Sequence, residues 1–197
     1  QELGRMIKEA GINFNSLEPE DHDSPFGEYS GAGTIFGASG GVAEAAVRTA
    51  YEFATGEQLN DVDIKQMRGT SNRSRTIELD LKGTKLVVRV VSTLKEAEKA
   101  LREIKEGKAD FQMLEVMACP GGCVNGGGQP RSCDDSRIKG ERAEGLYKED
   151  STLPLRKSHM NPSIQKLYQE YLEQPNSHKA HEILHTTYAN KFAGSYK

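Results

Sequence analysis

The sequence predicts an α/β fold: a small, partly parallel sheet flanked by helices and followed by a helical C-terminal tail. Three observations carry this prediction. Two strand-like runs separated by a turn stand near the middle of the chain, and Val87-Val88-Arg89-Val90-Val91 is the strongest of them. A helical pattern and a third strand-like run follow, and a strand–helix–strand order favours a parallel crossover. Beyond residue 135 the periodic patterns are helical.

The chain opens with a helical pattern over residues 2–10, which ends at Gly11. Residues 13–29 are polar, acidic and proline-containing, so we expect a loop there. A glycine-rich loop at residues 31–41 then leads into an alanine-rich helix. The apolar residues of that helix recur at helical spacing: Val42, Ala45, Ala46, Ala50 and Phe53.

Three strands are expected to form the sheet. Residues 76–81 and 85–91 form a hairpin around a tight turn at residues 82–84. An amphipathic helix begins near Leu94 and ends at Gly107, and residues 111–117 form the third strand. Because sites in open α/β sheets lie at the carboxyl ends of strands, Met117 and Cys119 occupy a favourable position.

The tail is expected to contain three helices. Residues 136–148 predict a weak helix that is broken by Gly140 and Gly145. Asn161 and Pro162 supply a cap and a first-turn proline for the second helix, which ends at Pro175. Ser177 is expected to cap the last helix.

Composition and charge exclude several classes of function. The 197 residues suit one domain or part of a larger one, and a helical pattern that starts at once without a methionine suggests a fragment or processed subunit. A net charge of −3 argues against a nucleic-acid partner. No apolar run reaches the roughly 18 residues of a membrane span, and no signal peptide is evident. We therefore expect a cytoplasmic protein with no membrane partner, and a periplasmic location stays open.

Two thiols, Cys119 and Cys123, lie four residues apart in a stretch that contains five glycines. Glycine lets the main chain approach a large object closely, and thiolates suit soft metal ions. The stretch therefore predicts a cradle for an inorganic cluster; a glycine-rich turn with two incidental thiols is the alternative. Clusters usually take four ligands, so further ligands must come from elsewhere. The third thiol, Cys133, is expected to be free or packed.

Two other motifs suggest different functions. The glycines at residues 31–41 resemble a dinucleotide fingerprint, but no strand-like run precedes them and no acidic residue follows at the required place. His181-Glu182-Ile183-Leu184-His185 matches the H-E-x-x-H pattern of zinc hydrolases. Only twelve residues follow His185, and none of them is a glutamate. His178 could be a third ligand but is expected on the same short helix, so packing roles for these histidines are favoured.

The stretch from Glu115 to Pro130 resembles the third cysteine motif of iron-only (FeFe) hydrogenases. It reads Glu115-x-Met117-Ala118-Cys119-x-x-Gly122-Cys123-x-x-Gly126-Gly127-Gly128-Gln129-Pro130. The resemblance extends over the whole chain, because residues 35–42 are similar to the family's glycine-rich loop and residues 157–185 to its C-terminal segment. The H-E-x-x-H run then belongs to a family segment rather than to a protease site.

This resemblance implies a cofactor and a role for several residues. In such enzymes four cysteines hold a four-iron–four-sulfur cubane, and the fourth also bridges to a diiron centre with carbonyl, cyanide and dithiolate ligands. Cys119 is then a cubane ligand and Cys123 the bridging cysteine, while Met117 and Phe36 line the pocket of the diiron unit. The cofactor-binding residues implied in this way are Cys119, Cys123, Gly37 and Gly122. The implied activity is the reversible interconversion of protons plus electrons and molecular hydrogen at this H-cluster.

The same resemblance implies how the chain is organised. Residues 1–135 correspond to the C-terminal lobe of the catalytic domain, and residues 136–197 to a tail that resembles the hydrogenase small subunit. Two upstream family motifs, of the kinds T-S-C-x-P and M-P-C-x-x-K, occur nowhere in the chain. They would carry two cubane cysteines, so the chain alone is expected to be inactive. The implied partners are the N-terminal remainder, ferredoxin or another redox carrier, hydrogen and protons. A noncatalytic relative in iron–sulfur assembly or sensing is the alternative function.

Overall fold

The computed structural model of the chain describes residues 1–24, 27–131 and 135–188. These residues form a sheet in the order β1-β2-β3, with β1 at Ser74–Leu81, β2 at Thr84–Ser92 and β3 at Met113–Met117. β1 pairs antiparallel with β2 in a hairpin, and β3 pairs parallel with β2. The predicted partly parallel sheet is confirmed, and the first and last residues of the strands lie within two residues of the expected ones.

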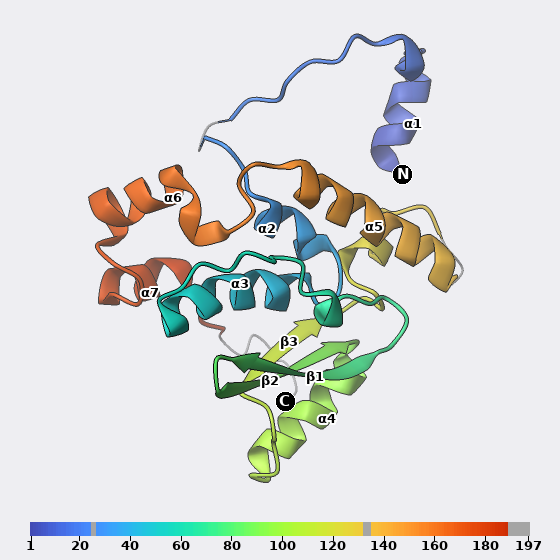
Figure 1. Cartoon of the computed structure of the whole chain (residues 1–197). Coiled ribbons are helices and arrows are strands. Elements are labelled where there is room, and N and C mark those ends of the chain that lie inside the picture. Colours follow the sequence, from blue (N-terminus) through green and yellow to red (C-terminus); the bar gives the residue numbers. More distant parts are fainter. Residues whose placement is uncertain (25–26, 132–134, 189–197) are drawn as a thin grey trace, which may run out of the picture.

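Helices flank the sheet and continue beyond it. They are α1 (Glu2–Glu9), α2 (Gly31–Thr34), α3 (Gly41–Thr55), α4 (Leu94–Lys105), α5 (Ser136–Thr152), α6 (Pro162–Leu167) and α7 (His178–Leu184). α3 covers one face of the sheet and α4 the opposite face, while α2 and α5 lie beyond α3 (Figure 1). α1 lies at the end of an extended segment (Figure 1), and none of its residues is buried.

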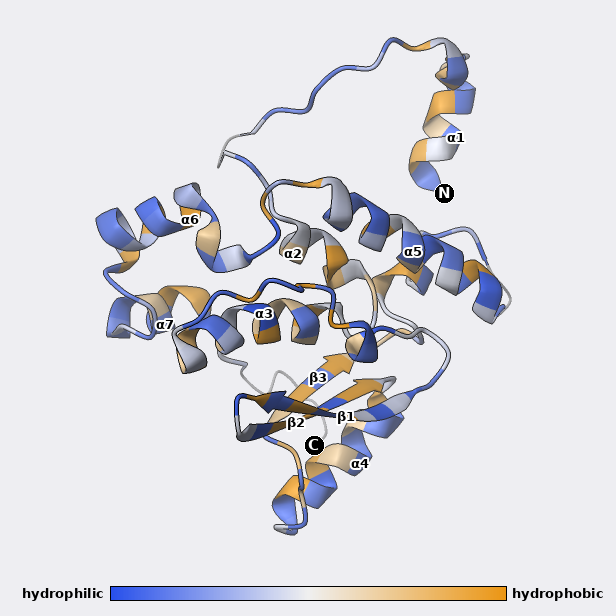
Figure 2. Ribbon diagram, in the orientation of Figure 1, coloured by the Kyte–Doolittle hydropathy of each residue, from blue (hydrophilic) through white to orange (hydrophobic). Residues whose placement is uncertain are grey.

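Two buried clusters hold these layers together. One joins α3 to the sheet and contains Ala43, Val47, Met67, Ile77, Val88 and Val90. The other joins α2, α3 and α5 and contains Ala32, Ile35, Ala38, Ala45, Ala143 and Tyr147. Hydrophobic residues concentrate on β3 and the inner helices, whereas α5 is largely hydrophilic on its outside (Figure 2). α3 contributes to both clusters and is therefore the central helix of the fold.

Two sequence-based expectations about local structure are wrong. α5 is continuous through Gly140 and Gly145. A Cβ added at either glycine would meet no atom within 4 Å, so both face outward, and each costs only about 1 kcal/mol relative to alanine. Burial of the opposite side, at Lys139, Ala143, Tyr147 and Asp150, outweighs that cost. The expected loop at residues 31–41 is instead α2 and a 3-10 turn at Ile35–Gly37.

The predicted helix caps in the tail are confirmed. The side-chain oxygen of Asn161 accepts hydrogen bonds from the N–H groups of Ser163 (2.9 Å) and Ile164 (3.3 Å). Ser177 Oγ accepts from the N–H of Ala180 at 3.0 Å. α6 continues as a π-helical turn, Tyr168–Leu172, and ends before Pro175. Over the described residues, no helix combines the length and apolarity that a membrane crossing requires.

Candidate functional site

The two thiols lie on a loop that leaves the carboxyl end of β3. We call residues 118–130 the cysteine loop. Cys119 is half-buried, Cys123 is exposed, and neither forms a disulfide. The N–H of Gly122 donates to the carbonyl of Cys119 at 3.0 Å, and a 3-10 turn, Cys123–Asn125, follows. The main chain of the loop thus folds into consecutive tight turns around the two cysteines, and both thiols stay available as ligands.

A second segment packs against the cysteine loop. We call residues 35–40 the Phe36 loop; its 3-10 turn contacts the turn that contains Cys123. Gly122 has φ of +96°, and a Cβ there would lie 2.6 Å from the nitrogen of Ser39 and 2.8 Å from the carbonyl oxygen of Gly37. Only glycine fits this contact. Phe36 keeps 45% of its surface exposed, and the 3-10 turn that carries it contacts the turn that contains Cys123.

Hydrogen bonds fasten these two loops to each other and to β3. The N–H of Ser39 donates to the carbonyl of Gly121 at 3.1 Å. The Glu115 carboxylate on β3 accepts from the N–H of Gly40 at 2.6 Å and from the N–H of Ala43 at 2.8 Å. Sequence reasoning did not assign a role to Glu115. The available signal was a carboxylate in an otherwise mostly apolar strand, because such a side chain needs a partner once it is buried.

Side chains of α5 contact both the cysteine loop and the Phe36 loop. Arg142 donates to the carbonyls of Val124 at 2.9 Å and Pro130 at 2.8 Å. A Cβ on Gly37 would lie 2.7 Å from a methyl group of Leu146, so the Phe36 loop lies directly against α5. The polar and glycine-containing sequence of α5 gave no sign of these contacts. The tail is consequently part of the scaffold of the cysteine loop.

A buried ion-pair network locks α5 to α3. Arg48 donates to Glu44 at 2.8 Å and to both oxygens of Asp150 at 2.9 and 2.8 Å, and all three side chains are fully buried. Burial alone would raise the pKa of Asp150, but hydrogen bonds from Arg48 and Arg156 outweigh it and lower this pKa. Nearby, burial raises the pKa of Tyr147 to about 12. Asp150 therefore stays ionised and Tyr147 stays protonated near neutral pH, and the network serves the fold.

The predicted site residues divide into two groups in space. The first group lies where the two loops meet and contains Phe36, Gly37, Gly122 and Cys123. The second contains Cys119, which lies beside Gly126: a Cβ added to Gly126 would be 3.5 Å from the Cys119 sulfur. Met117, at the end of β3, is half-buried and leads directly into the cysteine loop. Cys133 lies outside the described residues. The roles of these residues toward a cluster stay predictions.

The H-E-x-x-H residues lie elsewhere and do not form a complete metal site. The ring of His181, on α7, stacks with that of His185, the residue directly after α7, with centroids 4.2 Å apart, and both residues are exposed. Within the described residues, no group of three or more His, Cys, Asp or Glu side chains is arranged to hold a metal ion. A hydrolytic zinc site needs three protein ligands, so the structure gives this motif no support.

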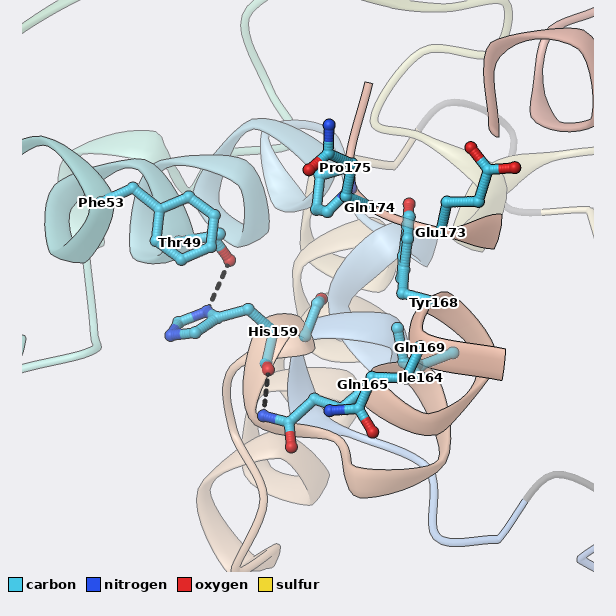
Figure 3. Close-up of a pocket in the computed structure, with 11 residues that line it drawn as sticks. Thr49, Phe53, His159, Ile164, Gln165, Tyr168, Gln169, Glu173, Gln174 and Pro175 are labelled. Carbon is cyan, nitrogen blue, oxygen red and sulfur yellow. Dashed lines mark hydrogen bonds between the residues drawn. The ribbon is translucent and has the colours of Figure 1, made fainter. Parts of the chain in front are cut away.

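A pocket of about 500 Å³ lies between α3 and the α6 region, and its lining includes Phe53, Ile164 and Tyr168 (Figure 3). His159 stands at its edge with both ring nitrogens engaged: one with the hydroxyl of Thr49 at 3.0 Å and the other with Glu52 at 2.7 Å. The cysteine loop contributes nothing to the lining. We therefore regard this pocket as separate from the thiol site.

A strand that delivers two free thiols into a glycine-rich loop is typical of proteins that bind an iron–sulfur cluster. The chain belongs to the iron-only hydrogenase family: the family model described as "Iron only hydrogenase large subunit, C-terminal domain" matches residues 1–127. The model described as "Iron hydrogenase small subunit" matches residues 136–191. The resemblance drawn from the cysteine motif is thus confirmed.

Individual relatives agree with this family. The NADP-reducing hydrogenase subunit HndD of Solidesulfovibrio fructosivorans is 44% identical over 95% of this chain and 32% of its own length. Iron hydrogenase 1 of Clostridium pasteurianum is 44% identical over 95% of this chain and 33% of its own length. The chain therefore spans about a third of these two relatives. The cytosolic iron-sulfur assembly component 3 of Rattus norvegicus is 31% identical, with 95% of this chain and 39% of the relative covered.

Solved structures share the fold. A variant of the FeFe-hydrogenase HydA1 from Chlamydomonas reinhardtii superposes with a TM-score of 0.70 at 39% identity, over 95% of this chain and 54% of that chain. A HydA structure that reveals stepwise assembly of the FeFe-hydrogenase H-cluster gives 0.68 at 38% identity, with the same coverage. The predicted α/β fold, with its small and partly parallel sheet, is confirmed as one that FeFe hydrogenases share.

Proposed function

We propose that this chain is the C-terminal part of an iron-only hydrogenase that reversibly interconverts protons plus electrons and molecular hydrogen. The observation that carries the proposal is the pair Cys119 and Cys123 at the carboxyl end of β3, in a glycine-rich loop that matches the family motif throughout. Residues 1–135 would form one lobe of the catalytic domain, and residues 136–197 its small-subunit-like tail. Similarity to hydrogenases over nearly the whole chain supports this assignment.

The residues present suit the H-cluster. Both thiols are free, and thiolates are the usual ligands of iron–sulfur clusters. Cys119 would ligate the cubane, and Cys123, which is more exposed, would ligate the cubane and bridge to the diiron unit. The small volume of Gly126 leaves the main chain close to the Cys119 sulfur, and that of Gly122 lets the two loops approach each other. When bound, the cluster would supply the redox chemistry that joins electrons and protons into hydrogen.

The remaining residues of the site would bind, orient and shield. Phe36 and Met117 would cover the diiron unit and limit the access of water, which raises the strength of electrostatic interactions in the site. Gly37 and Gly122 would keep the two loops in contact. Two thiols are half of the usual set of four ligands, so the isolated chain would be inactive and the N-terminal remainder would be its partner. Ferredoxin or another redox carrier would exchange electrons with the complete enzyme in the cytoplasm.

A noncatalytic role in iron–sulfur assembly is the second candidate function. It is motivated by relatives such as the assembly component of Rattus norvegicus at 31% identity. The identity of 44% to two hydrogenases favours catalysis. The two functions differ in one measurable property, because only the hydrogenase would carry the diiron unit and turn over hydrogen.

The test is to produce the longer protein, with the upstream region that its relatives possess, together with the machinery that matures the cluster. Hydrogen production and iron content are then measured for the wild type and for Cys123→Ser. We expect activity in the wild type and its loss in the variant, with a matching loss of diiron infrared bands. Iron–sulfur absorption without hydrogen turnover in the wild type would favour the assembly function. Full activity in Cys123→Ser would refute the bridging role.

A further inference from the structure

Glu115 links the strand that leads to the thiols with the helix that follows the Phe36 loop. The side chain is on β3, four residues before Cys119, and only 6% of the residue is exposed. One carboxylate oxygen accepts the N–H of Gly40 at 2.6 Å, and the other accepts the N–H of Ala43 at 2.8 Å. These partners stand 75 and 72 residues earlier in the chain.

The interaction is strong for a physical reason. The first N–H groups of a helix have no partner within the helix, and Gly40, the residue at the cap position of α3, has no side chain to supply one. The Glu115 carboxylate takes that place from another element. A negative charge at a helix N-terminus is favoured by the helix dipole, and charge-assisted hydrogen bonds are about twice as strong as neutral ones.

The position of this cap determines where the Phe36 loop sits. The loop runs directly into Gly40, and β3 runs directly into the cysteine loop, so the two hydrogen bonds of Glu115 join the bases of both loops. The Ser39–Gly121 hydrogen bond makes a second connection nearer the thiols. Phe36 itself is 45% exposed, so its place depends on the backbone that carries it.

We infer that Glu115 is a positioning residue for the H-cluster site: it holds the Phe36 loop at a fixed place beside Cys123 and thereby fixes the surroundings of the diiron unit. The inference rests on the proposed function. Glu115 acts through Phe36 and the α3 N-terminus. Replacing Glu115 should therefore change the spectrum of the cluster and kcat. The amount of cluster bound should stay the same, because β3 and both thiols remain in place.

The test uses Glu115→Gln in the complete, matured protein. Glutamine keeps the shape of the side chain but offers one acceptor oxygen for two N–H groups, so one N–H would face an NH2 group. We expect the infrared carbonyl and cyanide bands of the diiron unit to shift or split, and kcat to fall about tenfold at unchanged KM and unchanged iron content. Glu115→Asp keeps the charge but is one methylene shorter, and should give the same changes at smaller size.

Glu98→Gln is the matched control. Glu98 is an exposed carboxylate on α4 that pairs with Arg102 at 2.8 Å, and its loss should leave bands and kcat unchanged. If Glu115→Gln does not fold, Glu115→Asp decides. Bands and kcat identical to the wild type in the folded variants would overturn the inference, as would a lower melting temperature with an unchanged cluster spectrum. A wild type that shows no diiron bands after maturation would instead refute the proposed function itself.

Discussion

The guanidinium of Arg142 donates a hydrogen bond of 2.9 Å to the main-chain carbonyl of Val124, the residue that directly follows Cys123. Its second terminal nitrogen donates to Pro130 at 2.8 Å, so one side chain of α5 spans the last part of the cysteine loop. Residues 136–191 match the small-subunit model and residues 1–127 the large-subunit model. The contact therefore links the two parts of the chain at the place where the thiols are held.

Replacing Arg142 with glutamine should loosen the cysteine loop. The variant loses two charge-assisted hydrogen bonds from a half-buried side chain, which together contribute about 1–3 kcal/mol to stability. We expect faster amide hydrogen exchange in residues 121–130 and a lower yield of bound iron after maturation. Arg137→Gln on the same helix is the control, because Arg137 is exposed and pairs with the nearby carboxylates of Asp135 and Glu141. Equal exchange in both variants would contradict this role for Arg142.

A methyl group at Gly122 should force the two loops apart. The Cβ of alanine would lie 2.6 Å from the nitrogen of Ser39, and the residue would keep a φ of +96°, which L residues rarely adopt. Clash and backbone strain together should cost about 2 kcal/mol or more. We expect Gly122→Ala to lose most bound cluster and hydrogen turnover. Gly127→Ala is the matched control in the same loop, since its Cβ would meet no atom within 4 Å; wild-type activity is expected there.

The local features of this fold could be predicted from the sequence. The hairpin, the crossover helix and the caps at Asn161 and Ser177 depend on neighbouring residues, and the structure has all of them. The continuity of α5 could not be predicted from the sequence, because the residues that compensate for Gly140 and Gly145 bind partners far away in the chain. Asp150, for example, pairs with Arg48, which is 102 residues away.

In the candidate site, too, the local features could be predicted from the sequence and the long-range contacts could not. The cysteines and glycines form a contiguous motif, so the sequence could locate the cysteine loop and, by resemblance, the Phe36 loop. The contacts that hold the loops together involve Glu115 and Arg142, and their partners are main-chain groups. Main-chain partners cannot be recognised from the amino-acid sequence, since every non-proline residue has the same N–H and C=O. Only the folded arrangement identifies them.

Removal of Asp150 should strongly destabilise the protein. Asp150 accepts from Arg48 and Arg156, and the variant Asp150→Ala would leave the fully buried Arg48 with Glu44 as its remaining carboxylate partner. Breaking one side of a buried ion pair costs about 3–5 kcal/mol. Urea denaturation followed by circular dichroism measures the effect. Glu98→Ala breaks an exposed pair with Arg102 and should cost at most about 1 kcal/mol; a similar loss in both variants would show that the network is not what stabilises α5 on α3.

Acid should weaken the attachment of the tail to α3 through Glu52. Hydrogen bonds from Lys157, and then from the Leu59 N–H and His159, outweigh burial and lower the pKa of Glu52 from 4.5 to about 2. A carboxylate whose pKa is lower in the folded state stabilises the protein above its unfolded-state pKa. That stability is lost as the pH falls from about 5 toward 2. Other carboxylates titrate in the same range, so the measurement is the difference in unfolding free energy between wild type and Glu52→Gln at each pH. We expect this difference to be on the order of 2 kcal/mol at pH 7 and to shrink as the pH approaches 2. A difference that stays constant over this range would show that the Glu52 charge does not hold Lys157 and His159 in place.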